Sequence, residues 1–351
     1  MEQPRAGSPA EANVSVLRCF GGHSIVGAVV VVLALCASPA LAGEPVAKWC
    51  SGVKVAAFPG GPKDDAFAKI VEAGFRQAEL DLGPTLTYAY SDWNPNTLIA
   101  QIDQALGSKV DGIAAYGFAG DAATESRAER LFAEGGVFTS LDVPLPKLAA
   151  RFAGKGFGYV GAPNYKAGAA LATEAAVRAK LGKGDTVLVW GVRGKGGERA
   201  QRTIGVADTL AKAGMKVVYH EIDEATLQNP DAGLGAFTTL MKANPSTKLV
   251  ITDQGSLTAD ATTLGKAAGL EPGKVFFAGF ELTAASARAI TEGYQNLVLD
   301  QQPFLQGYLS VLDICLAKKF GFQGLDVTTA GAFVDKGNVE AISALMAKGI
   351  R

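Results

Sequence analysis

The fold is decided by the segment Leu297-Val298-Leu299-Asp300-Gln301-Gln302-Pro303-Phe304-Leu305-Gln306-Gly307-Tyr308, in which an apolar strand stops at one acid and two amides. Pro303 has no backbone N–H for a strand ladder but suits the first turn of a helix. The chain is therefore predicted to leave a sheet here and to enter the helix that carries Tyr308 and Leu312. Because ligands of open parallel sheets bind beside the carboxyl ends of the strands, this polar run is expected to lie at a binding site.

Short apolar strands alternate with amphipathic helices along the chain, and the pattern restarts after Pro144-Leu145-Pro146. Such alternation is typical of parallel strands joined by right-handed crossovers. The predicted strands are 53–58, 86–88, 112–116 and 137–141 in the first half, and 187–190, 216–219, 248–252, 275–280 and 297–299 in the second. A helix at 304–319 and a late strand at 332–334 indicate that the chain crosses between lobes a third time.

The predicted fold class is therefore α/β, with two similar doubly wound parallel-sheet lobes joined by a three-strand hinge. The first crossing is expected near Asp142. The N-terminal lobe is expected at 43–142 plus 302–325, and the C-terminal lobe at 143–301 plus 326–351. The first helix, which carries Phe67, is expected to be capped by Asp64 or Asp65 and to end at Gly83.

Residues 1–42 have the features of a secretory signal peptide. An apolar stretch at 25–35 precedes Ala40-Leu41-Ala42, a small-x-small cleavage signature. The stretch is shorter than the ~20 residues of a membrane-spanning helix, so cleavage and export of a soluble chain are expected. An uncleaved anchor is the alternative; a lipid attachment at Cys36 is disfavoured because Leu35 precedes it.

Charge and histidine content exclude several classes of protein. The formal net charge is −1 and the sequence has no dense basic cluster, so nucleic acid and anionic membranes are not expected partners. His220 is the one histidine left after signal removal, which argues against a His-based catalytic triad or metal centre. The glycine-rich stretches 193–197 and 156–161 are interpreted as plain loops, because neither has the spacing and acidic partner of a nucleotide-binding loop.

Several motifs follow one another in a recognisable order. They are Asp65-Ala66-Phe67-Ala68, Gly120-Asp121-Ala122, Glu198-Arg199-Ala200-Gln201-Arg202-Thr203-Ile204-Gly205, Asp253-Gln254, Gly279-Phe280-Glu281, and Gln301 shortly before Pro303. In these motifs nearly the whole mature chain resembles the ribose- and galactose-type sugar-binding proteins of bacterial ABC importers, which have the type I periplasmic binding protein fold.

The resemblance implies a set of ligand-binding residues. Phe67 would stack on a sugar ring, and Arg199, with Arg202 as second choice, would donate to its oxygens. The polar contacts would come from Asp65, Asp121, Asp253, Glu281 and Gln301. Trp190, at the end of a predicted strand, is a further candidate. Phe67 and Trp190 could equally belong to the apolar core, and Asp121 could cap a helix.

The resemblance also implies what the chain does. It would capture a small neutral sugar or polyol in a cleft between the lobes and deliver it to ABC permease subunits in the inner membrane. It would act as a periplasmic monomer, without catalysis, cofactor or metal. The alternatives are a ligand-sensing module for a chemoreceptor or sensor kinase, and a secreted α/β enzyme. The identity of the sugar stays open, because Ala66, Ala68 and Glu281 depart from the family pattern. In such a fold Cys50 and Cys315 would share a lobe, so an oxidising compartment would allow them to pair.

Overall fold

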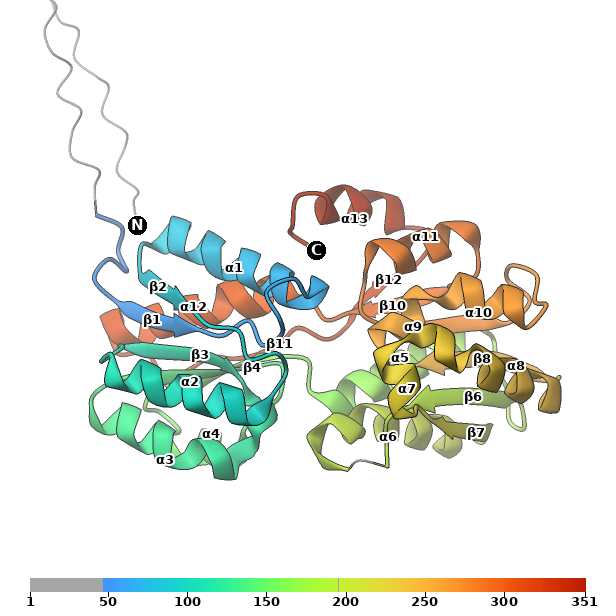
Figure 1. Cartoon of the computed structure of the whole chain (residues 1–351), viewed down its shortest axis with the longest axis horizontal. Coiled ribbons are helices and arrows are strands. Elements are labelled where there is room, and N and C mark those ends of the chain that lie inside the picture. The colour runs from blue at the N-terminus through green and yellow to red at the C-terminus, as the bar shows by residue number, and fades with distance from the viewer. Residues whose placement is uncertain (1–46, 195) are drawn as a thin grey trace, which may run out of the picture. The chain divides into compact units, whose positions relative to one another are not determined.

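Two six-stranded sheets organise the chain in the computed structural model, which describes residues 47–194 and 196–351 (Figure 1). Helices cover both faces of each sheet, and the four faces are packed as separate apolar clusters. The predicted α/β class with two doubly wound lobes is thereby confirmed. The predicted signal peptide, 1–42, lies outside the described residues.

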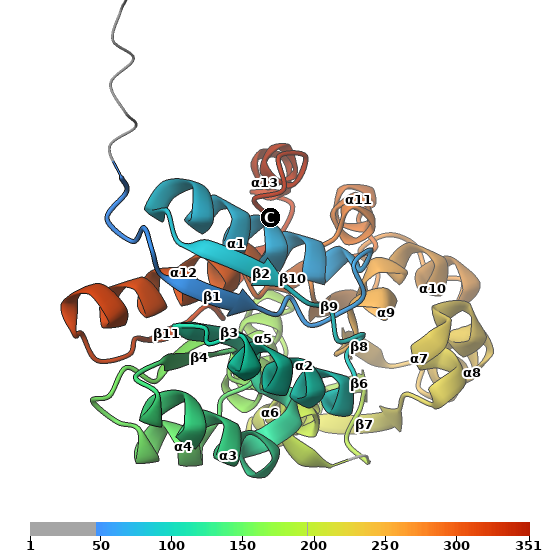
Figure 2. The same ribbon diagram turned by 60° about the vertical axis from the view of Figure 1, so that its left-hand side comes forward.

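The first sheet has the strand order β11-β5-β4-β3-β1-β2, and all its neighbouring strands are parallel. Its strands are β1 (Lys54–Ala57), β2 (Thr85–Tyr88), β3 (Gly112–Tyr116), β4 (Val137–Leu141), β5 (Gly158–Gly161) and β11 (Asp326–Thr328). Its helices are α1 (Ala66–Leu82), α2 (Pro95–Gly107), α3 (Gly120–Ala133), α4 (Pro146–Arg151) and α12 (Pro303–Phe320). Helices α1 and α12 cover one face with side chains such as Phe75 and Ile314, and α2 and α3 cover the other with Ile102 and Leu131 (Figure 2).

The second sheet has the strand order β12-β10-β9-β8-β6-β7, and β12 is its antiparallel strand. Its strands are β6 (Thr186–Gly191), β7 (Lys216–Glu221), β8 (Thr247–Thr252), β9 (Phe276–Phe280), β10 (Leu297–Asp300) and β12 (Ala332–Val334). Its helices are α5 (Asn164–Arg178), α6 (Gly197–Lys212), α7 (Glu224–Gln228), α8 (Leu234–Ala243), α9 (Gly255–Ala259), α10 (Ala261–Ala267), α11 (Ala284–Glu292) and α13 (Val339–Met346). Helices α5 and α6 pack on one face, and α8 and α10 pack on the other.

Strand pairing moves two of the predicted lobe boundaries. The segment after Asp142 was assigned to the second lobe, but β5 pairs with β4 in the first sheet, so the first crossing comes after Gly161. Residues 326–328 were also assigned to the second lobe, but they form β11 and pair with β5. The chain therefore changes sheets after β5, between β10 and α12, and between β11 and β12.

Strand β5 lies in a stretch that the sequence analysis interpreted as a plain loop. Its glycines are explained by close packing: a Cβ at Gly158 would collide with the Asp313 carboxylate, and one at Gly161 would collide with the backbone of Asp142. A short strand with glycine at both ends has little of the apolar alternation that identifies a strand in sequence. The strand was therefore missed.

Local interactions fix helix α1 against the sheet and against α12. The side chain of Asp65 accepts a hydrogen bond from the Ala68 N–H, so Asp65 is the N-cap, and Gly83 ends the helix in the left-handed conformation. Helices α1 and α12 can approach closely because Gly74 and Gly307 have no Cβ. A Cβ at either position would collide with the backbone of the opposite helix. Cys50 and Cys315 form a disulfide, with Cα atoms 5.6 Å apart, that ties the segment before β1 to α12.

None of the helices in 47–194 and 196–351 is both long enough and apolar enough to cross a lipid bilayer.

Candidate functional site

Residues from both lobes line a cavity of about 550 Å³, called the central cavity below. The first lobe contributes Asp65, Phe67, Trp93, Pro95, Tyr116, Phe118, Asp142 and Val143, and the remaining lining residues are Gly196, Gly197, Glu198, Arg199, Arg202, Gln254, Glu281 and Gln301. Six of the nine residues predicted from the sequence are in this set: Asp65, Phe67, Arg199, Arg202, Glu281 and Gln301. Most follow the carboxyl ends of strands, where ligands of parallel sheets bind.

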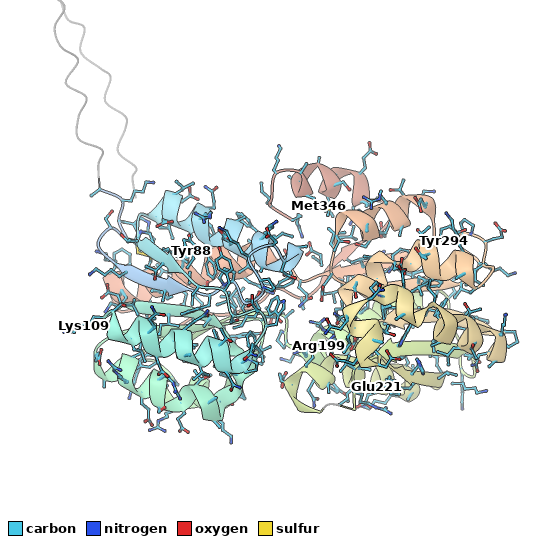
Figure 3. All side chains as sticks on the ribbon, in the orientation of Figure 1. Tyr88, Lys109, Arg199, Glu221, Tyr294 and Met346 are labelled. Carbon is cyan, nitrogen blue, oxygen red and sulfur yellow. A yellow bond between two sulfur atoms is a disulfide. The ribbon has the colours of Figure 1, made fainter. Side chains whose placement is uncertain are left out.

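Arg199 lies on helix α6 (Figure 3). Its guanidinium is held by the buried carboxylate of Asp253. One terminal nitrogen donates to Asp253 Oδ2 at 3.0 Å, and the other donates to the Asp253 carbonyl at 3.0 Å and to Gln254 Oε1 at 3.3 Å. Burial alone would lower the pKa of Arg199, but the Asp253 carboxylate outweighs burial and the net shift is upward. The Arg199 side chain is still 39 % exposed, so it can reach a ligand.

Asp253 does not itself line the central cavity. It is 0 % exposed, and its carboxylate accepts hydrogen bonds from Arg199, from the Thr203 hydroxyl and from the Val192 N–H. These contacts give Asp253 a positioning function: it orients the Arg199 guanidinium.

Arg202, one turn after Arg199, lies deeper and bridges several polar groups. Its side chain donates to Asn164 Oδ1 at 3.2 Å and to the Asp253 carbonyl at 3.3 Å, and it lies 3.5 Å from Glu281 Oε1. Its guanidinium lies 4.6 Å from the centre of the Phe280 ring. Burial and the neighbouring Arg199 lower the pKa of Arg202, whereas burial raises the pKa of Glu281 against the pull of both arginines.

Gln301 lies where the chain leaves β10 for α12, as the sequence analysis expected. Its amide nitrogen donates to Asp142 Oδ1 at 3.0 Å, while its Oε1 is buried and has no hydrogen-bond partner within the described part of the chain. Gln306 also donates to Asp142, to the Gln301 carbonyl and to Thr329. This network joins the crossing after β10 to Thr329, which borders the crossing between β11 and β12.

Asp142 was not predicted as a site residue, although its position was noted as a possible crossing. It follows β4 and has a left-handed backbone, with φ of 54°. Burial raises the pKa of its carboxyl group, and the partly opposing effects come from Arg202, from the Gln306 and Gln301 side chains and from Arg199. A polar residue directly after a predicted strand was the sequence signal that could have identified it.

An aromatic cluster forms one wall of the central cavity. The Trp93 ring lies 5.3 Å from Tyr116, 6.1 Å from Phe118 and 6.2 Å from Phe67, measured between ring centres. Only Phe67 was predicted. Trp93 is missed by strand periodicity, because it lies in the loop between β2 and α2 with φ of 55°.

Besides Asp253, two predicted residues do not line this cavity. Asp121 lies in the first turn of α3, and its carboxylate accepts a hydrogen bond from the Leu148 N–H at 3.0 Å, which positions helix α4. Trp190 is buried at the end of β6 and stacks on Phe237, with ring centres 5.7 Å apart. Trp190 therefore has the core position that the sequence left open as an alternative, whereas Asp121 does not cap its own helix, whose N-cap is Ala119.

A second cavity of about 870 Å³ shares Asp65, Phe67, Gln254, Glu281 and Gln301 with the central one. Its outer wall includes Met346 of α13 and Arg351, and Arg351 pairs with the buried Asp300 carboxylate. The two cavities therefore lie next to each other, on either side of these shared residues.

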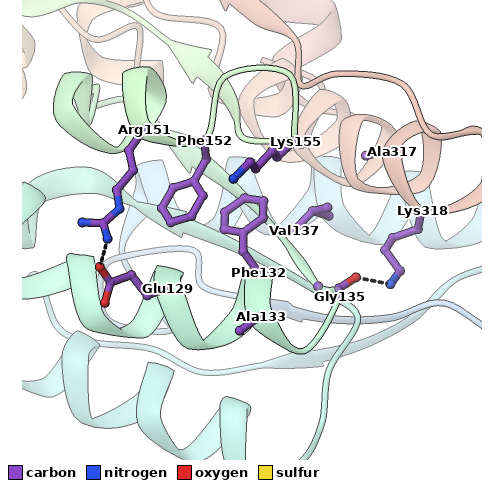
Figure 4. Close-up of a pocket in the computed structure, with 11 residues that line it drawn as sticks. Glu129, Phe132, Ala133, Gly135, Val137, Arg151, Phe152, Lys155, Ala317 and Lys318 are labelled. Atoms are coloured by element: carbon purple, nitrogen blue, oxygen red, sulfur yellow. Dashed lines mark hydrogen bonds and ion pairs between the residues drawn. The ribbon is translucent and has the colours of Figure 1, made fainter.

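A third cavity, of about 670 Å³, lies elsewhere in the first lobe (Figure 4). Its walls include the stacked rings of Phe132 and Phe152, 4.2 Å apart, the Arg151–Glu129 ion pair, and Lys318, which donates to the Gly135 carbonyl. It borders the start of β4, the opposite end of the strand from Asp142, and it contains none of the predicted site residues.

Within residues 47–194 and 196–351, no group of three or more His, Cys, Asp or Glu side chains is placed to hold a metal ion.

A family model described as "Periplasmic binding protein domain" matches residues 31–317 of this chain. A search of curated protein sequences finds no match.

Solved structures share the fold at low sequence identity. An ABC transporter solute-binding protein from Burkholderia graminis, in complex with D-arabinose, is 23 % identical, with a TM-score of 0.68 over 82 % of this chain and 97 % of that one. A carbohydrate transporter from Acidothermus cellulolyticus, in complex with myo-inositol, is 22 % identical, with a TM-score of 0.68 over 85 % and 99 %. A putative LacI transcriptional regulator from Bacteroides fragilis is 14 % identical, with a TM-score of 0.62 over 83 % and 99 %. These similarities show the fold, which transport proteins and regulators share.

Proposed function

Since this chain belongs to the periplasmic binding protein family, we propose that it captures a small hydroxyl-rich molecule, a sugar or polyol, and delivers it to an ABC-type permease. The observation that carries the proposal is the central cavity, where an aromatic wall from the first lobe faces hydrogen-bonding groups from the second. Its volume is within the roughly 300–1,000 Å³ of small-molecule sites.

The lining suits a polyhydroxylated ring. Trp93 and Phe67 offer apolar faces to the C–H side of a sugar, while Arg199 donates and Glu281 accepts at the opposite side. Arg199 is already oriented by Asp253, so little side-chain freedom is lost when it binds an oxygen. The D-arabinose in the Burkholderia complex and the myo-inositol in the Acidothermus complex, a sugar and a polyol, support the class of ligand proposed here.

Because the two lobes are joined by crossings of the chain, ligand binding can change how far the lobes close. One ligand can contact both lobes only in a closed arrangement. A ligand bound to one lobe therefore favours closure, because closure adds its contacts with the other lobe. Gln301 lies at such a crossing and lines the cavity, which links occupancy to the crossing itself. The permease in the inner membrane would recognise the closed form. We place the protein in the periplasm, exported by its signal peptide, as a monomer that performs no covalent chemistry.

A thermal-shift screen over a library of sugars and polyols tests the proposal. A ligand that binds only the native state stabilises it by about 2.7 kcal/mol at a hundredfold excess over Kd. At least one sugar or polyol should raise the melting temperature, and its mass should be unchanged after prolonged incubation with the protein. A library without any hit would contradict sugar capture, and a changed mass would favour a secreted enzyme.

A further inference from the structure

Acidic side chains outnumber basic ones among the described residues that line the central cavity. Its lining includes four carboxylates, on Asp65, Asp142, Glu198 and Glu281, and two guanidinium groups, on Arg199 and Arg202. Both guanidinium groups already have anionic partners, because Arg199 pairs with Asp253 behind the wall and Arg202 lies 3.5 Å from Glu281. Both arginines of the described lining are therefore already paired, and acidic side chains remain in excess of them.

Asp142 and Asp65 contribute two of these four carboxyl groups. Among the described residues, neither has a cationic partner within 4.0 Å. The Asp142 carboxylate accepts from the neutral amides of Gln301 and Gln306, and the Asp65 carboxylate accepts from the Ala68 N–H. Both residues are partly buried, and a positive charge supplied by the ligand would interact favourably with two carboxylates that have no ion-pair partner.

An independent observation is the side-chain carbonyl of Gln301. The residue is 1 % exposed and lines the cavity. Its amide nitrogen donates to Asp142, while its Oε1 has no partner within the described chain. A buried acceptor without a donor is rare in a folded protein and indicates that a donor arrives with the ligand. The orientation of the amide is fixed by the Asp142 contact, because only the nitrogen can donate to a carboxylate oxygen.

These acceptors line the same cavity as Tyr116. The carboxylates of Asp142, Asp65 and Glu281 all act on the hydroxyl of Tyr116, whose pKa is raised by burial first and by these three charges in addition. The Trp93 ring packs edge to face against the Tyr116 ring at 5.3 Å. Aromatic faces attract cations, and tryptophan does so most strongly.

We propose that the ligand is a sugar or polyol that carries an ammonium group. The ammonium group would be held among Asp65, Asp142, Glu281 and the unpaired side-chain oxygen of Gln301 (Oε1), beside the Trp93 and Tyr116 rings. This inference rests on the proposed function and narrows its substrate class from the neutral ligand that the family resemblance implies. An ammonium group supplies up to three N–H donors and no acceptor, which matches an acceptor-rich pocket. A hydroxyl group supplies one donor and adds acceptors of its own.

The test compares matched pairs of probes that differ by one amino group. Isothermal titration at a mildly acidic pH, where the amines are charged, would compare D-glucosamine with D-glucose, D-galactosamine with D-galactose, and D-glucamine with D-sorbitol. N-acetyl-D-glucosamine serves as the uncharged amide control. At least one amine should bind at least tenfold more tightly than its hydroxyl partner and its acetylated form. The preference should shrink at high salt, because screening weakens the charge interaction.

Charge-removing variants locate the effect. Asp142→Asn keeps the oxygen that accepts from Gln301 and removes the charge, so it should reduce the amine-to-hydroxyl ratio of affinities at least threefold. Glu271→Gln, on an exposed surface position, should leave that ratio unchanged. The ratio is measured within one protein sample, so partial misfolding of a variant does not imitate the result.

The outcomes separate the two levels of inference. Hydroxyl members that bind as tightly as their amines, or more tightly, overturn the ammonium proposal and leave sugar capture standing. If neither the amines nor their hydroxyl partners bind, and no member of the wider carbohydrate library binds, both the ammonium proposal and the proposed function are contradicted. If Asp142→Asn does not fold, the ratio measured with the wild-type protein decides alone.

Discussion

Arg199 links ligand binding to the stability of the second lobe. Arg199→Ala removes a donor from the cavity, so we expect affinity for a hit from the ligand screen to fall at least tenfold, a loss of about 1.4 kcal/mol or more. The substitution also takes the cationic partner away from Asp253, which is fully buried. We expect the free energy of unfolding to fall by about 1–3 kcal/mol, measured by denaturant titration without ligand.

Arg193→Ala is the matched control. Arg193 lies in the loop that leads from β6 into α6, but it is exposed, stacks on Tyr219 at 4.1 Å and does not line the central cavity. It should leave affinity unchanged. Equal losses for both variants would mean that the loop, and not the guanidinium of Arg199, controls binding.

Residues with a strand before them were easier to predict than residues in loops. Glu281 and Gln301 follow strands that the apolar pattern identified, and both line the cavity. Trp93 and Phe118 lie in connections whose backbone path is set by tertiary packing, so no periodicity points to them. Asp253 shows a different limit: its position was right, but only the structure reveals that Arg199, Thr203 and Val192 already use its carboxylate.

At the scale of elements, Asp313 anchors helix α12 to the first sheet. Its carboxylate accepts from the Thr139 hydroxyl on β4 at 2.7 Å and from the Leu325 N–H, just before β11, at 2.8 Å. Burial raises its pKa to about 6, although both hydrogen bonds oppose the shift. The folded state therefore binds this proton more tightly than the unfolded state, whose pKa is near 3.8.

The sign of the pH dependence follows from this difference. Between about pH 4 and pH 6 the folded state holds more protons at Asp313, so its contribution to stability falls as pH rises through this window and is constant above it. Asp313→Asn removes the titration. Relative to the wild type, the variant should gain stability on going from pH 4 to pH 7, by about 1–3 kcal/mol, since one pKa unit corresponds to about 1.4 kcal/mol.

Denaturant titrations of both proteins at pH 4, 5, 6 and 7 measure this difference. Asp326→Asn, at an exposed position on the neighbouring strand β11, serves as the control. Its free energy of unfolding should change with pH in the same way as that of the wild type. A stability difference between Asp313→Asn and the wild type that does not change with pH would contradict the raised pKa.

Helix α12 is also held by the disulfide to Cys50. Replacing both cysteines with alanine should lower the free energy of unfolding by about 2–4 kcal/mol, because the cross-link restricts the unfolded chain. Ligand affinity should be unchanged, since neither cysteine lines the central cavity. Intact mass after alkylation, with and without reduction, checks the bond first; two free thiols in the unreduced protein would contradict it.

The sequence predicted the long helices and most of the strands, including the three-residue β12, but it missed two short strands. Helices α1 and α12 were found within two residues of their observed bounds, because their apolar positions repeat at helical spacing over several turns. Strands β5 and β11 are four and three residues long and were missed, so the lobe boundaries that depend on them were misplaced. Pairing across a sheet is a long-range property that local pattern does not contain.

At the scale of the whole molecule, the crossing between β10 and α12 offers a matched pair of neighbouring amides. Gln301 lines the central cavity and contacts Asp142, whereas Gln302 points to the other crossing and donates to the Thr329 carbonyl at 2.8 Å. Gln301→Ala should weaken ligand binding at least fivefold, and Gln302→Ala should weaken it by less than twofold, both measured by calorimetry. Equal effects would show that the crossing backbone, and not the Gln301 side chain, controls affinity.

Ligand-driven closure is the prediction that depends on both lobes at once. Trp93 and Phe67 belong to the first lobe and Arg199 to the second, so a ligand that contacts all three is bound most tightly when the lobes approach. Small-angle scattering should show a smaller radius of gyration with saturating ligand than without it.

The size of that response should depend on contacts with the second lobe. Arg199→Ala, measured at a ligand concentration that gives the same occupancy as in the wild type, keeps the aromatic wall but loses the contact that favours closure. Its radius of gyration should therefore decrease less on binding, whereas Arg193→Ala should respond like the wild type. A ligand shifts an equilibrium only by its difference in affinity for the two states, so equal compaction in all three proteins would show that Arg199 binds the open and closed forms alike. No compaction at all, in a wild-type protein shown by scattering to be open without ligand, would contradict capture between two lobes.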